Sequence, residues 1–78
     1  MTIHKVIEPY AAANIDELTL EGGQHVYILK QIAGDWWEGM TKDQVGWLPK
    51  SHVEPLDIQE DQKPAWINVT LTLSLYLT

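Results

Sequence analysis

The chain has 78 residues, eleven acidic and five basic side chains that leave a formal net charge of −6, and no cysteine. A chain of this length makes one small domain that buries only about 60% of its unfolded surface, which favours a binding surface over an enclosed active site. The acidic balance argues against a nucleic-acid partner, and the lack of cysteine excludes disulfides, thiolate nucleophiles and thiolate metal ligands.

The N-terminal segment and the overall composition predict a cytoplasmic protein. The first ten residues have neither the apolar core of a signal peptide nor the Arg-rich, amphipathic character of a transit peptide. No segment reaches the roughly 20 apolar residues that a membrane helix needs. We therefore expect no membrane span. Because the chain has no cysteine to form disulfides, we also expect a reducing compartment.

Short strands and turns follow one another along the first part of the chain. Residues 4–10 predict a first strand that ends at Pro9, because proline cannot continue a central ladder. Residues 11–17 have neither strand alternation nor helix caps and predict a long irregular loop. Residues 18–31 predict a turn at Gly22–Gly23 followed by an alternating strand.

The central part of the chain continues the same pattern. Residues 34–41 predict a third strand and residues 45–49 a fourth, with a tight turn over residues 42–44 between them. Residues 50–53 predict one helical turn. Short strands at regular spacing predict a small all-β sandwich or barrel.

The C-terminal part differs in kind. Residues 58–65 predict a polar, acidic linker. In the last segment, residues 66–78, apolar side chains alternate strictly with polar ones from residue 68 onward. At strand spacing this alternation makes one apolar face, which is prone to edge pairing when exposed. Such a segment covers the sheet of its own domain, pairs with a second copy to make a homodimer, or stays disordered, and the sequence leaves these alternatives open.

Four motifs in sequence order resemble those of the SH3 (Src homology 3) domain family over residues 3–57. The family's first strand and RT loop, ALYDY followed by a DELSF-like stretch, are similar to VIEPYAAANIDELTL at residues 6–20. Its tryptophan pair is similar to WWEG at residues 36–39, and its G-x-x-P-S-x-Y-V segment to GWLPKSHV at residues 46–53. The resemblance implies an all-β fold, a small five-stranded SH3-like barrel with RT, n-Src and distal loops and a short 3-10 turn.

The resemblance also implies a function. SH3-like domains bind proline-rich segments in the polyproline II conformation, whose stiff ridges fit slots between aromatic rings. A neighbouring carboxylate cluster then fixes the orientation of the ligand by pairing with its Arg or Lys. We therefore expect a protein-protein interaction module within a larger adaptor, scaffold or signalling protein.

The resemblance assigns these roles to residues by position. The groove positions fall on three aromatic residues and a proline, which are Tyr10, Trp36, Trp47 and Pro49. The acidic positions that choose the polarity of the ligand fall on Asp16 and Glu17 in the RT loop and on Asp35 in the n-Src loop. Trp37 is expected to pack on the other side of its strand, because neighbouring strand residues point to opposite faces.

Two groove positions depart from the family pattern. Glu8 and His52 stand where the resemblance implies two tyrosines that wall the outer proline slot. Each lost ring contact removes about 0.5–1.5 kcal/mol, and a buried carboxylate costs desolvation free energy. Two hypotheses follow: the slot takes a basic side chain through Glu8, or Glu8 and His52 pair with each other. The structural alternative is that His52 is a tolerated surface histidine.

A rival function belongs to a different class. A degenerate groove would make the chain a structural or regulatory module that docks a folded partner or self-associates through residues 66–78. An enzyme is not expected, because Ser51 beside His52 lacks an orienting acid and oxyanion donors. The remaining histidines, His4 and His25, do not complete a metal-ligand spacing, so we expect neither a metal nor a cofactor.

Overall fold

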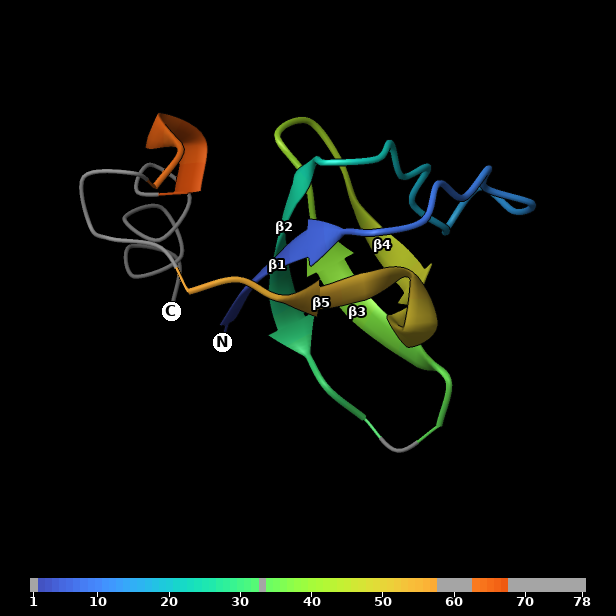
Figure 1. Ribbon diagram of the computed structural model, residues 1–78. Helices are drawn as coiled ribbons and strands as arrows, with labels where there is room; N and C mark the ends of the chain where they lie inside the picture. The colour runs from blue at the N-terminus through green and yellow to red at the C-terminus, as the bar shows by residue number, and fades with distance from the viewer. Residues whose placement is uncertain (1, 33, 58–62, 68–78) are drawn as a thin grey trace.

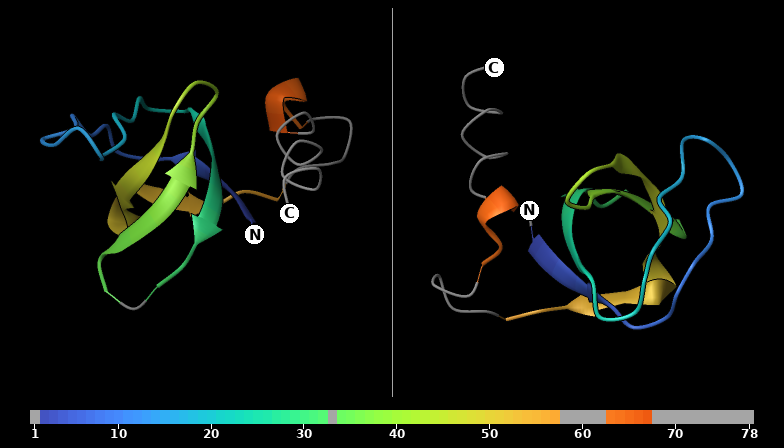
Figure 2. Two further views of the ribbon diagram at one scale, coloured as in Figure 1. Left: turned by 180° about the vertical axis from the view of Figure 1, so that it is seen from behind. Right: turned by 90° about the horizontal axis from the view of Figure 1, so that it is seen from above.

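The computed structural model describes residues 2–32, 34–57 and 63–67, and these contain one antiparallel sheet (Figure 1). Its spatial order is β4-β3-β2-β1-β5, and the expected five-stranded all-β fold is confirmed. The elements are β1 (Thr2–Val6), β2 (His25–Lys30), β3 (Trp36–Met40), β4 (Val45–Pro49), the 3-10 turn η1 (Lys50–His52) and β5 (Val53–Pro55). Seen from above, the sheet curls into a barrel (Figure 2).

The first strand is shorter than the predicted span of residues 4–10. After Val6 the backbone turns away from β2, and the N–H groups of Ile7 and Glu8 both donate to the carbonyl of His52, at 2.8 and 3.3 Å. Pro9 then has no N–H to offer a ladder. Pairing with η1 therefore replaces sheet pairing from Ile7 onward, which the sequence pattern of a single strand could not indicate.

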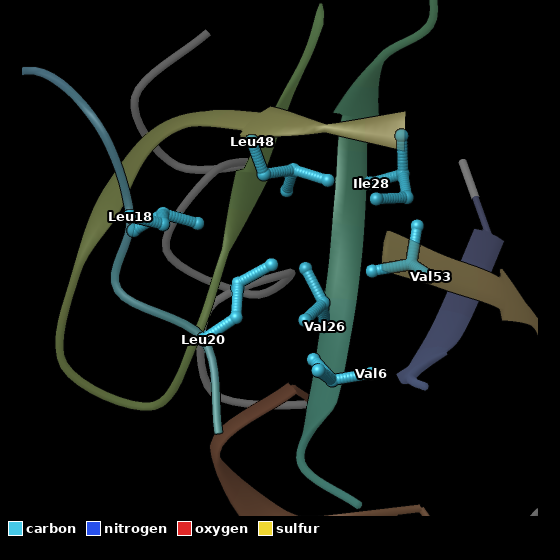
Figure 3. Close-up of a cluster of buried hydrophobic side chains, with 7 residues drawn as sticks. All are labelled: Val6, Leu18, Leu20, Val26, Ile28, Leu48 and Val53. Atoms are coloured by element: carbon cyan, nitrogen blue, oxygen red, sulfur yellow. The ribbon is translucent and has the colours of Figure 1, made fainter. Parts of the chain in front are cut away.

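Side chains of the central strand β2 alternate between two faces of the sheet. Val26 and Ile28 are buried inside the barrel, whereas Tyr27 and Leu29 point outward. This alternation is the period-two pattern that a strand requires. The residues that fill the barrel come from every strand except β3 and from the loop before β2 (Figure 3); they are Val6, Leu18, Leu20, Val26, Ile28, Leu48 and Val53.

A second apolar cluster lies on the outer face of the same sheet. Ile67 is 1% exposed and packs with Tyr27 of β2 and Met40 of β3, and Trp66 packs against this cluster. In Figures 1 and 2 the short helical piece stands beside β1 and β2, outside the barrel. Trp66 and Ile67 thus cover part of an outer face of the sheet.

The beginning of the predicted C-terminal segment is helical, not extended. Residues 65–67 form a helical turn, in which the Ile67 N–H donates to the Pro64 carbonyl at 3.1 Å. Proline suits the first turn of a helix because its φ angle is already helical and its missing N–H is not needed there. Residues 68–78, and residues 58–62 of the predicted linker, lie outside the described residues, so the homodimer through 66–78 stays a prediction. In the part of the chain that the structure describes, no helix has the length and apolar character to cross a membrane.

Candidate peptide-binding site

The loop between β1 and β2, residues 7–24, forms one wall of the site and corresponds to the expected RT loop. Tyr10 and Leu20 exchange both backbone hydrogen bonds across it, at 3.0 and 2.8 Å, so its base is a two-stranded ribbon. Leu18 and Leu20 are buried in the barrel and anchor its returning arm. The loop is therefore held in place by its own hydrogen bonds and by the core.

The RT loop is also joined to β4. The Trp47 N–H donates to the Asp16 carbonyl at 2.8 Å, and the Leu18 N–H donates to the Trp47 carbonyl at 2.7 Å. This approach requires glycine at position 46, because a Cβ there would lie 2.7 Å from the Asp16 carbonyl oxygen. The pairing places the acidic end of the loop beside the Trp47 indole.

The two adjacent tryptophans of β3 point to opposite sides, as expected for a strand. Trp37 packs against the core, and its ring meets the edge of the buried His4 ring at 5.5 Å. Trp36 is 37% exposed and pairs across the ladder with Pro49 of β4. One indole thus stabilises the barrel, and the other is available on its surface.

Trp36 belongs to a row of rings on that surface. The Tyr10 ring lies edge-on to Trp36 with centroids 5.8 Å apart, and edge-on to His52 with centroids 5.5 Å apart. Rings in this arrangement leave slots between them rather than a continuous stack. Four residues that the resemblance assigned to one groove come from separate elements and meet in this row or beside it. They are Tyr10, Trp36, Pro49 and His52.

An open pocket of about 710 Å³ lies at the Trp36 end of the row. It is lined by Asn14, Ile15, Asp16, Glu17, Ile32, Trp36 and Trp47. Ile15 and Ile32 are exposed isoleucines that sequence reasoning missed, although an isoleucine within a polar loop is a usable signal. Asp35 is outside the residues that line this pocket, and its carbonyl accepts a hydrogen bond from the Lys50 N–H at 2.9 Å.

The two acidic residues of the RT loop differ in their surroundings. The Glu17 carboxylate accepts hydrogen bonds from the Tyr10 hydroxyl at 2.5 Å, the Asn14 side-chain amide at 2.7 Å and the Ala13 N–H at 2.9 Å. These bonds, chiefly the one from Tyr10, lower the pKa of Glu17 to about 2. The hydrogen bond between Tyr10 and Glu17 also raises the pKa of Tyr10. Glu17 therefore ties the loop to the aromatic row, whereas Asp16 is an exposed carboxylate at the pocket.

The site combines flat apolar rings with negative charge. No group of three histidine, cysteine, aspartate or glutamate side chains that could hold a metal ion is found within residues 2–32, 34–57 and 63–67. Partly exposed rings beside carboxylates suit a ligand that is apolar along its length and cationic at one end. The geometry is that of a binding groove.

Comparison with known proteins identifies the family. Residues 3–56 match the family model described as the variant SH3 domain. Intersectin-1 of Xenopus laevis is 42% identical over 59 residues, which cover 69% of this chain and 4% of that protein. Intersectin-2 of Mus musculus is 34% identical over 80 residues, which cover 95% of this chain and 5% of that protein. The chain thus spans a small fraction of the length of these relatives.

Solved structures agree with the family model. The C-terminal SH3 domain of myosin IB from Entamoeba histolytica is 34% identical with a TM-score of 0.66, and the match covers 70% of this chain and 92% of that one. That domain has also been solved bound to the EhFP10(GEF) peptide. The Acanthamoeba myosin I SH3 domain bound to Acan125 is 29% identical with a TM-score of 0.68, covering 70% of this chain and 95% of that one. The chain belongs to the SH3 domain family.

Proposed function

We propose that this chain is a protein-interaction module that binds proline-rich segments flanked by Arg or Lys, within a larger cytoplasmic adaptor, scaffold or signalling protein. The observation that carries the proposal is the ring row of Tyr10 and Trp36 leading into the acidic pocket of Asp16. The related myosin IB domain, which has been solved with a bound peptide, supports a peptide as the ligand.

The proposed ligand fits the groove for physical reasons. A polyproline II segment has no internal hydrogen bonds and three residues per turn, so its ridges enter the slots between rings set edge-on. It is stiff before it binds, and less conformational entropy is lost on docking. A guanidinium or ammonium group at one end would then meet Asp16 beside the Trp36 and Trp47 indoles.

Chemical-shift mapping of the full chain with proline-rich peptides tests the proposal. Peptides with Arg at either end are titrated into ¹⁵N-labelled protein, and the expected shifts are at the Trp36 and Trp47 indoles, Tyr10 and Asp16. Trp36→Lys is expected to weaken binding at least tenfold and leave the fold intact, because that side chain is partly exposed and outside the core. Unchanged affinity of this variant would place the contact surface elsewhere.

The rival function is docking of a folded partner through a groove that no longer takes proline. Its support is the pair of polar side chains, Glu8 and His52, at the end of the ring row. The same titration separates the two functions. A folded domain whose binding shifts signals away from Trp36, together with silence for every peptide, would favour the rival.

A further inference from the structure

The end of the ring row opposite the acidic pocket carries a carboxylate and an imidazole side by side. The His52 ring contacts Tyr10, and Tyr10 contacts Trp36, which lines the pocket. The Glu8 side chain is 68% exposed and that of His52 is 20% exposed. This end is therefore open to a ligand that already lies along the row.

A hydrogen bond to the backbone fixes the tautomer of the neutral His52 ring, so that its unprotonated nitrogen faces the Glu8 carboxylate. His52 Nδ1 lies 3.1 Å from the Glu8 carbonyl oxygen, which can only accept, so Nδ1 carries the proton of that hydrogen bond. In the neutral ring, Nε2 then has a lone pair. Nε2 lies 4.0 Å from Glu8 Oε2, a carboxylate oxygen that is also an acceptor.

Two acceptors at this separation make a site for a donor. A distance of 4.0 Å is too long for a direct hydrogen bond, yet it is less than twice the usual length of about 2.9 Å. One nitrogen can therefore bond to Glu8 Oε2 and His52 Nε2 at the same time. An ammonium group supplies three donors and the opposite charge to the carboxylate, and a lysine stem packs its methylenes along neighbouring rings.

We propose that Glu8 and His52 form a second subsite of the groove, for a Lys or Arg side chain of the ligand. The inference rests on the proposed function and sharpens it: the preferred ligand has a basic residue at each end of its proline-rich stretch. The ring centroids of His52 and Tyr10 lie 5.5 Å apart, and those of Tyr10 and Trp36 lie 5.8 Å apart. A polyproline II segment rises about 3.1 Å per residue, so at most about four of its residues cover this path. A proline at this subsite would cover a carboxylate without supplying a donor.

Matched peptides test the subsite on the full 78-residue chain. Each peptide carries one Arg for the Asp16 pocket, at its N-terminus in one series and at its C-terminus in the other. One position four, five or six residues from this Arg holds either Lys or norleucine. Norleucine keeps the apolar stem and removes the ammonium group. Affinities are measured by calorimetry with the unchanged protein, with Glu8→Gln, and with Glu21→Gln, which removes the same charge from an exposed position in the turn before β2.

The expected result is a three- to five-fold tighter binding of the Lys peptide than of its norleucine partner at one position, the range of an exposed ion pair. Glu8→Gln removes this preference, and Glu21→Gln keeps it. His52→Phe, which retains a ring against Tyr10, reduces it. Raising NaCl from 50 to 500 mM also shrinks it, since the pair is open to solvent.

Other outcomes overturn the subsite in distinguishable ways. Equal affinities for Lys and norleucine, with the Trp36 indole still shifted by both peptides, would refute the subsite and leave the proposed function standing. Equal losses in Glu8→Gln and Glu21→Gln would assign the preference to net charge alone. No shift at Trp36 with any peptide would refute both proposals.

Discussion

The Glu17 carboxylate is tied to the RT loop and to the Tyr10 ring. Its carboxylate accepts three hydrogen bonds from Tyr10, Ala13 and Asn14, all within the RT loop or at its base. A carboxylate engaged in this way holds the loop and the Tyr10 ring in register with Trp36. We therefore expect Asp16 to attract the ligand's charge, and Glu17 to position the surface that the ligand meets.

The low pKa of Glu17 predicts a particular acid sensitivity. Because its folded-state pKa is about 2 against an ordinary 4.5, its ionised form stabilises the fold, and this stabilisation is fully present above about pH 4.5. It is lost as the pH falls from 4.5 through 2. Urea unfolding at steps between pH 6 and 2 is expected to show a steeper loss of stability in the unchanged chain than in Glu17→Gln.

Tyr10→Phe is the control for this expectation. It keeps the ring contacts with Trp36 and His52 and removes the largest cause of the lowered pKa. The Glu17 pKa, followed by carboxyl ¹³C NMR, is expected to rise in this variant. An unchanged value would mean that the Tyr10 hydroxyl does not hold the carboxylate.

At the scale of elements, the site depends on how the RT loop meets β4. Gly46→Ala places a methyl group 2.7 Å from the Asp16 carbonyl, so the backbone must move apart. We expect a loss of about 1–3 kcal/mol in unfolding free energy, the usual cost of overpacking, together with weaker peptide binding. Gly22→Ala is a matched control, since nothing lies within 4 Å of its added Cβ. Equal effects of the two changes would contradict the close approach.

The C-terminal helical piece is the second element with a defined role. Ile67 is buried against Tyr27 and Met40 on the outer face, away from the ring row. Ile67→Ala is expected to cost about 2 kcal/mol or more in unfolding free energy, from lost transfer energy and the cavity left behind, with peptide affinity unchanged.

Ile32→Ala is the same substitution at a pocket-lining isoleucine that is 46% exposed. It is expected to show the reverse pattern, with weaker peptide binding and nearly unchanged stability. Urea titration and calorimetry of both variants measure the two effects. Full stability in Ile67→Ala would show that the outer face does not need the helical piece.

For the whole molecule, the net charge of −6 favours basic ligands at long range as well as in the groove. The association rate of an Arg-flanked peptide is expected to fall several-fold between 20 and 500 mM NaCl, because salt screens charges that are more than a Debye length apart. A peptide with neutral ends should show little change. Stopped-flow tryptophan fluorescence measures both rates, and an equal salt effect on the two peptides would contradict steering by the protein's charge.

Strand patterns together with the resemblance of four motifs to a known family predicted the five-stranded fold. Strand alternation separates inward Val26 and Ile28 from outward neighbours, and the order of four short motifs indicates the SH3 fold with Tyr10, Trp36 and Pro49 on one surface. The alternation follows from the fixed period of a strand and can be read without the fold, whereas the groove positions came from the resemblance of the four motifs to the family.

Long-range contacts decided the remaining features. The ladder of β1 ends at Val6 because the N–H of Ile7 donates to the carbonyl of His52, 45 residues further along the chain. Ile32 lines the same pocket as residues of the RT loop. Residues 65–67 are helical beside the sheet, whereas residue 65 had been predicted to belong to a linker and residues 66 and 67 to a strand-like or disordered segment. Each of these three features depends on which surfaces meet after folding. A pattern of adjacent residues does not determine which distant segments come into contact.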